Sequence, residues 1–160
     1  MANYEDKLPK KINWKLLTDL EKLHLLDNKY FCMLPWTHIH AYPNGDAYPC
    51  CLASHKHPIG SMREQTIEEL WNNDAMKDLR KNMLSGKFSK QCVKCYEQEQ
   101  NGWTSMRKSA NMHFGHHIKE IHDTKPDGHH DKVNMIYWDI RFSNLCNLSC
   151  RYCGSMFSSN

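Results

Sequence analysis

The sequence predicts an α+β fold in which a small cysteine-rich β-hairpin is surrounded by helices. Two alternating segments, THIHAY and DAYPC, flank Asn44-Gly45 and indicate a tight hairpin over residues 36–50, since both turn positions can adopt positive φ. Apolar residues recur at helical spacing on both sides of this hairpin. A later run, MIYWDIRF at residues 135–142, is rich in β-branched and aromatic residues and predicts a further strand.

The first predicted helix spans residues 13–27, before the hairpin. Asn13 is its candidate N-cap, and its leucines recur at helical spacing, which favours a helix packed on the rest of the chain. The leucines are Leu16, Leu17, Leu20 and Leu23.

More helices follow the hairpin. Thr66 and Glu69 have the spacing of a capping box and predict a short helix from residue 67. A second helix carries apolar residues on one face and is expected to stop at Gly86. These residues are Met76, Leu79 and Met83. Residues 96–122 are predicted to be mostly helical, with Gly102 as a weak point.

Composition divides the chain into four units and restricts its function. The units are an arm and helix (1–30), a cysteine-rich unit (31–122), a linker (123–132) and a terminal unit (133–160). Hydrophobic residues make up 40% and charged residues 24%, as in a folded soluble protein. A net charge of +3 does not indicate a nucleic-acid partner, and the chain lacks both a secretory signal and a run of about 20 apolar residues. We therefore expect a cytoplasmic protein with no membrane partner.

The chain has eight cysteines, and clustered cysteines in a reducing compartment indicate metal or redox chemistry. Cys146, Cys150 and Cys153 follow the predicted strand as C-x3-C-x2-C. Three thiolates can hold a 4Fe–4S cluster and leave one iron open for a ligand. A zinc knuckle completed by a histidine would use the same spacing.

Four more cysteines form a second set. Cys32 and Cys50 flank the predicted hairpin, and Cys92 and Cys95 form a C-x2-C pair. Four thiolates would make a closed site, suited to a structural role or to electron relay. Cys51 adjoins Cys50 and would face the opposite way on a strand, so we expect it to be spare.

The terminal unit resembles the radical S-adenosylmethionine (SAM) superfamily, which has C-x3-C-x-aromatic-C after the first strand of a partial α/β barrel. The resemblance implies that Cys146, Cys150 and Cys153 hold a 4Fe–4S cluster, with Tyr152 beside the cluster or the adenine. In that family the open iron chelates SAM. An external electron donor then drives cleavage to a 5′-deoxyadenosyl radical.

The cysteine-rich unit resembles the twitch and SPASM accessory domains of the same enzymes. The segments CMLPWTHIHAYPNGDAYPC, TIEELWNN and CVKC carry the resemblance. It implies an auxiliary iron–sulfur cluster at the twitch form's four ligands, here Cys32, Cys50, Cys92 and Cys95. It also implies a substrate that is a peptide or protein, or a cofactor undergoing maturation.

On a first barrel strand, Tyr137, Asp139 and Arg141 would point into the lumen, and the apolar alternates would face the outer helices. Asp139 and Arg141 would then contact cofactor or substrate. A salt-bridged pair with a purely structural role is equally compatible with the sequence.

Two features depart from the resemblance. The accessory unit precedes the barrel strand, and only seven residues follow Cys153. We therefore expect the chain to be the N-terminal fragment of a radical SAM enzyme, inactive alone, rather than half of a split enzyme. A zinc-stabilised binding module and an iron–sulfur electron-transfer subunit are the alternatives. We expect His38, His40 and the His-rich stretch from His113 to His130 not to bind metal.

Overall fold

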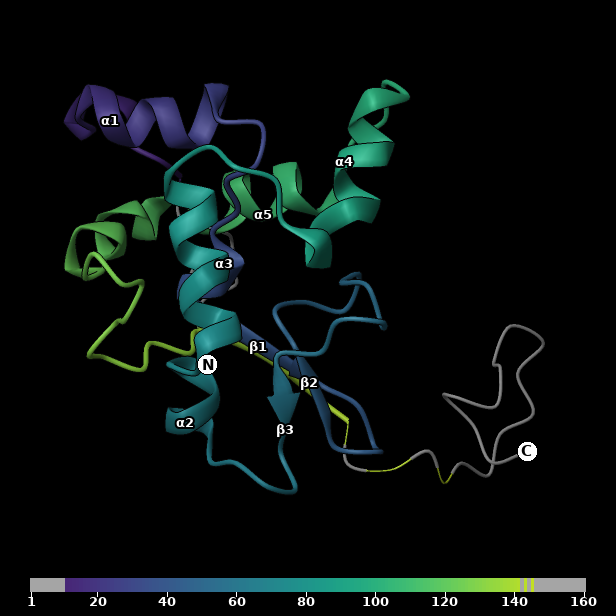
Figure 1. Cartoon of the computed structure of the whole chain (residues 1–160). Helices are drawn as coiled ribbons and strands as arrows, with labels where there is room; N and C mark the ends of the chain where they lie inside the picture. The colour runs from purple at the N-terminus through teal and green to yellow at the C-terminus, as the bar shows by residue number, and fades with distance from the viewer. Residues whose placement is uncertain (1–10, 142, 144, 146–160) are drawn as a thin grey trace, which may run out of the picture.

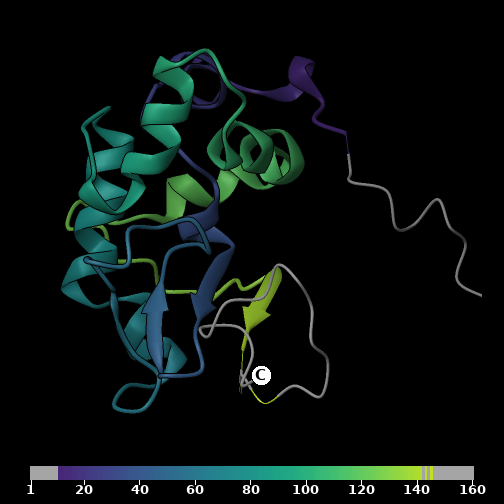
Figure 2. The same cartoon turned by 90° about the vertical axis from the view of Figure 1, so that its right-hand side faces the viewer.

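The computed structural model describes residues 11–141, 143 and 145. Its centre is a four-stranded sheet in the order β3-β2-β1-β4. The strands are β1 (His38–Ala41), β2 (Asp46–Tyr48), β3 (Gly60–Ser61) and β4 (Tyr137–Ile140). Helices α1, α4 and α5 gather beyond one end of the sheet, and α3 runs from them towards it (Figures 1 and 2).

The predicted hairpin is confirmed, but its turn differs from the prediction. Strands β1 and β2 pair antiparallel, with His40 opposite Tyr48. Of the two turn residues, Gly45 has a positive φ of 95°. Asn44 does not, since every described residue with positive φ is a glycine. Asn44 instead accepts the Asp46 N–H with its side chain at 3.0 Å. An Asx-type contact therefore replaces the second positive-φ position.

The strand predicted near the end of the chain is confirmed over Tyr137–Ile140. It pairs in parallel with β1, placing Tyr137 beside His38 and Asp139 beside His40. The strand thus belongs to the same sheet as the hairpin. That this strand also opens a partial barrel stays a prediction.

The helices after the hairpin follow the predicted pattern. They are α2 (Ile67–Trp71), α3 (Asp74–Leu84), α4 (Val93–Gln100) and α5 (Met106–Phe114), with the 3-10 turns η5 (Lys90–Cys92) and η6 (Gly115–Asp123). Another 3-10 turn, η4 (Leu34–Trp36), directly precedes the hairpin. Thr66 and Glu69 form the predicted capping box. Gly86 and Gly102 adopt positive φ after α3 and α4. The predicted helical stretch 96–122 breaks at Gly102, as expected.

The single helix predicted over 13–27 is wrong. The segment forms a 3-10 turn (Trp14–Leu16), the α-helix α1 (Asp19–Lys22) and a π-helical turn (Leu23–Asp27). Thr18 is extended and caps α1 through a capping box with Glu21, so the helix begins there rather than at Asn13. Of the predicted packing face, Leu17 packs against the core, whereas Leu16, Leu20 and Leu23 are each at least half exposed.

The core lies between the sheet and the helices, and it includes Phe31, Trp36, Ile39, Leu70, Trp71, Met76, Leu79, Met83 and Ile118. Arg80 of α3 is fully buried within it. Its guanidinium donates to the carbonyls of Pro35 and Trp71 at 3.0 and 2.8 Å and lies 4.7 Å from the Trp71 ring centroid. Burial lowers the pKa of Arg80 to about 9, so the side chain stays charged at neutral pH.

Residues 123–132, predicted as a linker, form a hydrogen-bonded loop in the structure. A bridge between Thr124 and His130 closes the loop, and Asn72 of the α2–α3 junction donates to the His130 carbonyl at 2.9 Å. Gly128 has a φ of 90°, and a Cβ there would lie 2.1 Å from the Lys77 carbonyl oxygen.

The boundaries of the four predicted units remain predictions. Within the described ranges, none of the helices combines the length and hydropathy that a bilayer span requires.

Candidate metal centre

Four of the five cysteines in the described part of the chain line one small cavity, and all five are free of disulfides. Cys32 precedes η4 and Cys50 follows β2. Cys92 is the N-cap of α4 and Cys95 lies in its first turn. The fold therefore gathers thiols from three separate segments. Two of them lie at a helix N-terminus, where the peptide dipoles favour a thiolate.

Backbone N–H groups lie beside three of the four sulfur atoms and favour their thiolate forms. The backbone N–H of Leu34 favours the thiolate of Cys32, and that of Leu52 favours the thiolate of Cys50. The N–H groups of Met106 and Arg107 do so for Cys95, whereas the Tyr96 hydroxyl, which lies near Cys92, donates its hydrogen to the Tyr30 carbonyl at 3.4 Å. Donors of this kind stabilise negative charge on sulfur and tune the reduction potential of thiolate-bound clusters. The donor set thus fits a group held by four thiolates.

Burial raises the pKa of all four thiols. Repulsion from neighbouring thiolates adds to the effect at Cys32, Cys50 and Cys92, and the Glu99 carboxylate adds to it at Cys95. The pKa of Cys92 rises to about 12. The thiols are therefore neutral at pH 7 without a metal. A metal ion reverses this preference, because its charge compensates the thiolates and binding releases protons.

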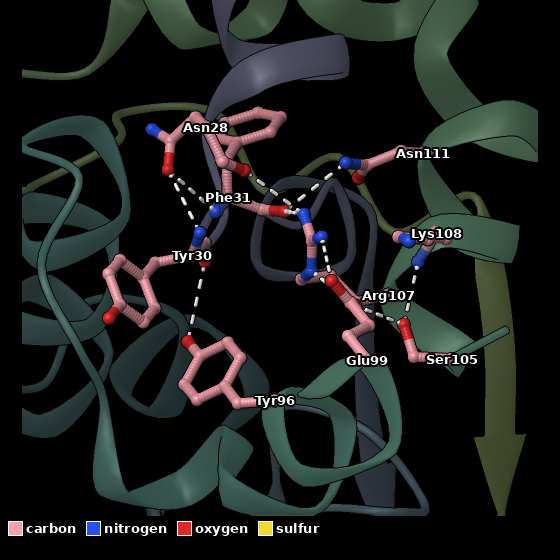
Figure 3. A network of polar contacts seen from close by, with 9 residues as sticks. All are labelled: Asn28, Tyr30, Phe31, Tyr96, Glu99, Ser105, Arg107, Lys108 and Asn111. Carbon is pink, nitrogen blue, oxygen red and sulfur yellow. Dashed lines mark hydrogen bonds and ion pairs between the residues drawn. The ribbon is translucent and has the colours of Figure 1, made fainter. Parts of the chain in front are cut away.

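A polar network fixes the cavity wall on the α5 side (Figure 3). Arg107 donates to Glu99 Oε1 at 2.8 Å and to the Phe31 carbonyl at 2.8 Å. Asn111 accepts the Met33 N–H at 2.9 Å and donates to the same Phe31 carbonyl. The two residues on either side of Cys32 are therefore tied to α5, whose first N–H groups face Cys95.

The ion pair in this network is nearly buried, with the Arg107 and Glu99 side chains 7% and 14% exposed. Burial alone would raise the pKa of Glu99, but hydrogen bonds from Arg107 and Ser105 outweigh it and lower that pKa. Arg107 also favours the thiolate form of Cys92 and Cys95 by its charge. The network therefore places a fixed positive charge beside the cavity.

Cys51 lies apart from this cavity, whereas Cys50 lines it. Burial raises the pKa of Cys51, and the neighbouring Asp139 carboxylate raises it further. The two adjacent cysteines thus face different surroundings. Cys51 belongs with a polar face of the sheet that includes the predicted residues Asp139 and Arg141.

That polar face is formed by alternate residues of β1 and β4. His40 Nδ1 lies 3.0 Å from Asp139 Oδ2, and Asp139 Oδ1 lies 3.5 Å from Arg141 Nε. His38 Nδ1 lies 2.8 Å from the Tyr137 carbonyl oxygen, and the His38 and Tyr137 rings stack at 4.5 Å. Both histidines are almost fully buried, which lowers their pKa values.

The sequence provided no reason to assign a functional role to these two histidines. Their alternation with Ile39 and Ala41 was visible, but their partners on β4 depend on the register of a parallel pair. Within residues 11–141, both ring nitrogens of His40 are buried without a hydrogen bond, although Nδ1 lies close to the Asp139 carboxylate. The remaining predicted site residues, Cys146, Cys150, Tyr152 and Cys153, lie outside the described residues.

Comparison with protein families gives one match. Residues 32–96 match the family model for SPASM, an iron–sulfur cluster-binding domain. The matched stretch begins at Cys32 and ends one residue after Cys95, so it contains all four cysteines of the cavity. Comparisons with the curated proteins and with the solved structures found no match.

Proposed function

We propose that Cys32, Cys50, Cys92 and Cys95 bind an iron–sulfur cluster as its four ligands. The observation that carries the proposal is one cavity lined by four thiols, two from buried and two from partly buried cysteines, with backbone N–H groups beside three of them. The SPASM match over the same residues supports it. Such a cluster, when bound, supplies one-electron transfer. Cysteine at all four ligand positions leaves no iron open to substrate, which suits an auxiliary relay.

We further propose that the chain is the N-terminal part of a radical SAM enzyme. SPASM domains occur in enzymes of that kind. In this proposal Cys146, Cys150 and Cys153 hold a second cluster, a 4Fe–4S cluster whose open iron binds SAM, and Tyr152 lies beside it. The parallel pairing of β1 with β4 supports the proposal, because it places the strand before these cysteines in the same sheet as the hairpin.

The polar face of the sheet is the proposed contact surface for cofactor or substrate. The Asp139 carboxylate lies 3.0 Å from His40 Nδ1 and favours a positive charge on this imidazole, whereas burial opposes it and lowers its pKa. Arg141 adds a positive charge 3.5 Å from Asp139 and suits a carboxylate or phosphate group. These side chains would bind and orient a ligand rather than carry electrons.

Metal analysis of protein purified and reconstituted without oxygen tests the auxiliary site. We expect iron and sulfide in equal amounts and a brown chromophore. Zinc as the only metal would overturn the proposal and support a zinc-stabilised binding module.

A spectroscopic titration with SAM tests the second cluster. We expect SAM to change the electron paramagnetic resonance spectrum of the reduced protein, because its amino and carboxylate groups would bind the open iron. The Cys146→Ala variant should lose this response and keep the auxiliary signal. An unchanged spectrum in the parent protein would count against radical SAM chemistry.

A further inference from the structure

Three side chains outside the metal centre converge where η6 meets the loop after it. Glu120 and Asp123 lie in the last turn of η6, and the bridge between Thr124 and His130 folds the chain back towards them. One potential ligand atom from each of Glu120, Asp123 and His130 lies within 4.8 Å of the other two. The sequence offered a His-rich stretch here but did not indicate which histidine the fold would bury.

The surroundings of His130 are rich in acceptors. Its side chain is wholly buried, and Nδ1 lies 2.7 Å from the Lys132 carbonyl oxygen. Nε2 lies 3.1 Å from the Glu120 carbonyl oxygen and 3.8 Å from Glu120 Oε2. A neutral imidazole has one N–H, which the shorter contact to Lys132 takes. The lone pair on Nε2 then faces only the lone pairs of oxygen atoms. This arrangement is repulsive, so a cation bound between Nε2 and these oxygens is favoured.

The Glu120 carboxylate leads to the same conclusion. Oε2 is buried and has no hydrogen-bond partner in the described part of the chain. Leaving a buried carboxylate oxygen unpaired is destabilising, because its desolvation is not compensated. A proton on Nε2 would point to the Glu120 carbonyl oxygen, which is closer, and would leave Oε2 unpaired. A metal ion would engage Nε2, Oε2 and the Asp123 carboxylate together.

The imidazole is also held in place as a ligand should be. Asn72 accepts the His130 N–H at 2.9 Å and donates to the His130 carbonyl at 2.9 Å. The Nδ1 contact to the Lys132 carbonyl is the backbone contact that commonly orients metal-binding histidines. His130 therefore needs little reorganisation to bind an ion through Nε2.

We propose that Glu120, Asp123 and His130 bind a divalent first-row metal ion. One imidazole and two carboxylates suit Mn²⁺, Fe²⁺ or Zn²⁺ and compensate the ionic charge. Ligand atoms around such an ion lie about 3–3.5 Å apart, so the present cluster needs only a small contraction. Three protein ligands leave room for water. The ion fastens the loop 124–130 to the end of η6, just before the chain enters β4.

Mn²⁺ is the probe for this site, because thiolates select softer metals and the cysteine cavity would not compete for it. We expect the whole chain to bind one Mn²⁺, measured by loss of the free-ion electron paramagnetic resonance signal. Bound Mn²⁺ should also raise the melting temperature, because it binds the folded state. Asp123→Asn and Glu120→Gln should each weaken binding at least about tenfold.

Asp127→Asn is the matched control. Asp127 lies on the same loop, and an asparagine there can still accept the His129 N–H. This variant should bind Mn²⁺ as tightly as the parent protein. Binding that is equally weakened in Asp127→Asn and Asp123→Asn would overturn the assignment of ligands. Absence of Mn²⁺ binding and of any shift in melting temperature would mean that the site holds only a proton, which also refutes the proposal.

Discussion

At the scale of single residues, the adjacent cysteines at 50 and 51 separate two environments of the molecule. Cys50 lines the cavity with three other thiols, whereas Cys51 lies near Asp139 on the polar face of the sheet. The two residues lie in a turn closed by the Ala53 N–H, which donates to the Cys50 carbonyl at 3.1 Å, rather than on the predicted strand, and this turn separates their side chains. Both residues are thiols, but Cys50 lies among other thiols and Cys51 lies near a carboxylate.

This difference predicts unequal effects of two otherwise identical substitutions. Cys50→Ala should abolish the auxiliary cluster, because a ligand is lost, and Cys51→Ala should leave it in place. Iron content and the visible absorption spectrum after anaerobic reconstitution measure the outcome. Equal loss of iron in both variants would show that Cys51 also serves the cluster.

At the scale of elements, the segment around Cys32, α4 and α5 are joined by the buried pair of Arg107 and Glu99. Removing one member of a buried ion pair leaves the other charge uncompensated and costs about 3–5 kcal/mol. Arg107 also donates to the carbonyls of Asn28 and Phe31, so its removal affects all three elements.

We expect Arg107→Met to lower the free energy of unfolding by about 3 kcal/mol, measured with urea on the metal-free chain. The double variant Arg107→Met/Glu99→Leu should recover part of the loss, because no unpaired carboxylate remains. Lys108→Met, one residue along on an exposed position of α5, is the control and should have little effect. A double variant as unstable as the sum of the two single variants would argue against coupling.

The start of α2 allows a smaller prediction on the same scale. Thr66 Oγ1 accepts the Glu69 N–H at 3.2 Å, and the Glu69 carboxylate accepts the Thr66 N–H at 2.7 Å. Thr66→Ala should therefore cost about 1 kcal/mol of unfolding free energy, and Thr66→Ser should cost much less. Urea denaturation measures both variants, and equal stability of Thr66→Ala and the parent would contradict the role of the cap.

Elements with local signals were predictable, and those set by distant contacts were not. The capping box at Thr66 and the break at Gly102 depend on neighbouring residues, and the structure has both. The helix over 13–27 failed because the leucine pattern does not reveal that Thr18 adopts an extended conformation. In the same way, spacing could group Cys92 with Cys95. The burial of His130 against Glu120 depends on a bridge that no local pattern indicates.

At the scale of the whole molecule, the sheet connects the cysteine cavity with the strand that leads to the last three cysteines. Strand β2 leads to Cys50, its partner β1 follows Cys32, and β4 lies on the other side of β1. Any cluster held beyond β4 would therefore belong to the same framework as the first. The two proposed clusters should nevertheless load separately, because their ligands are different residues.

We expect reconstitution of the chain to give about eight irons if both clusters are of the 4Fe–4S type. The triple variant Cys146→Ala/Cys150→Ala/Cys153→Ala should retain about four. Iron and protein assays on the same samples give the ratio, and far-ultraviolet circular dichroism checks that the variant is folded. A triple variant with no iron would show that the cavity cannot hold a cluster independently.

The parallel pairing of β1 with β4 has a consequence for how the protein is made. His38 and Tyr137 are adjacent in the sheet but about 100 residues apart along the chain. A ribosome adds about 5–20 residues per second, so one edge of β1 stays unpaired for roughly 5–20 s after it is synthesised. During that interval the edge can pair with other nascent chains. Slower translation through the helical region would lengthen this exposure and favour aggregation during expression.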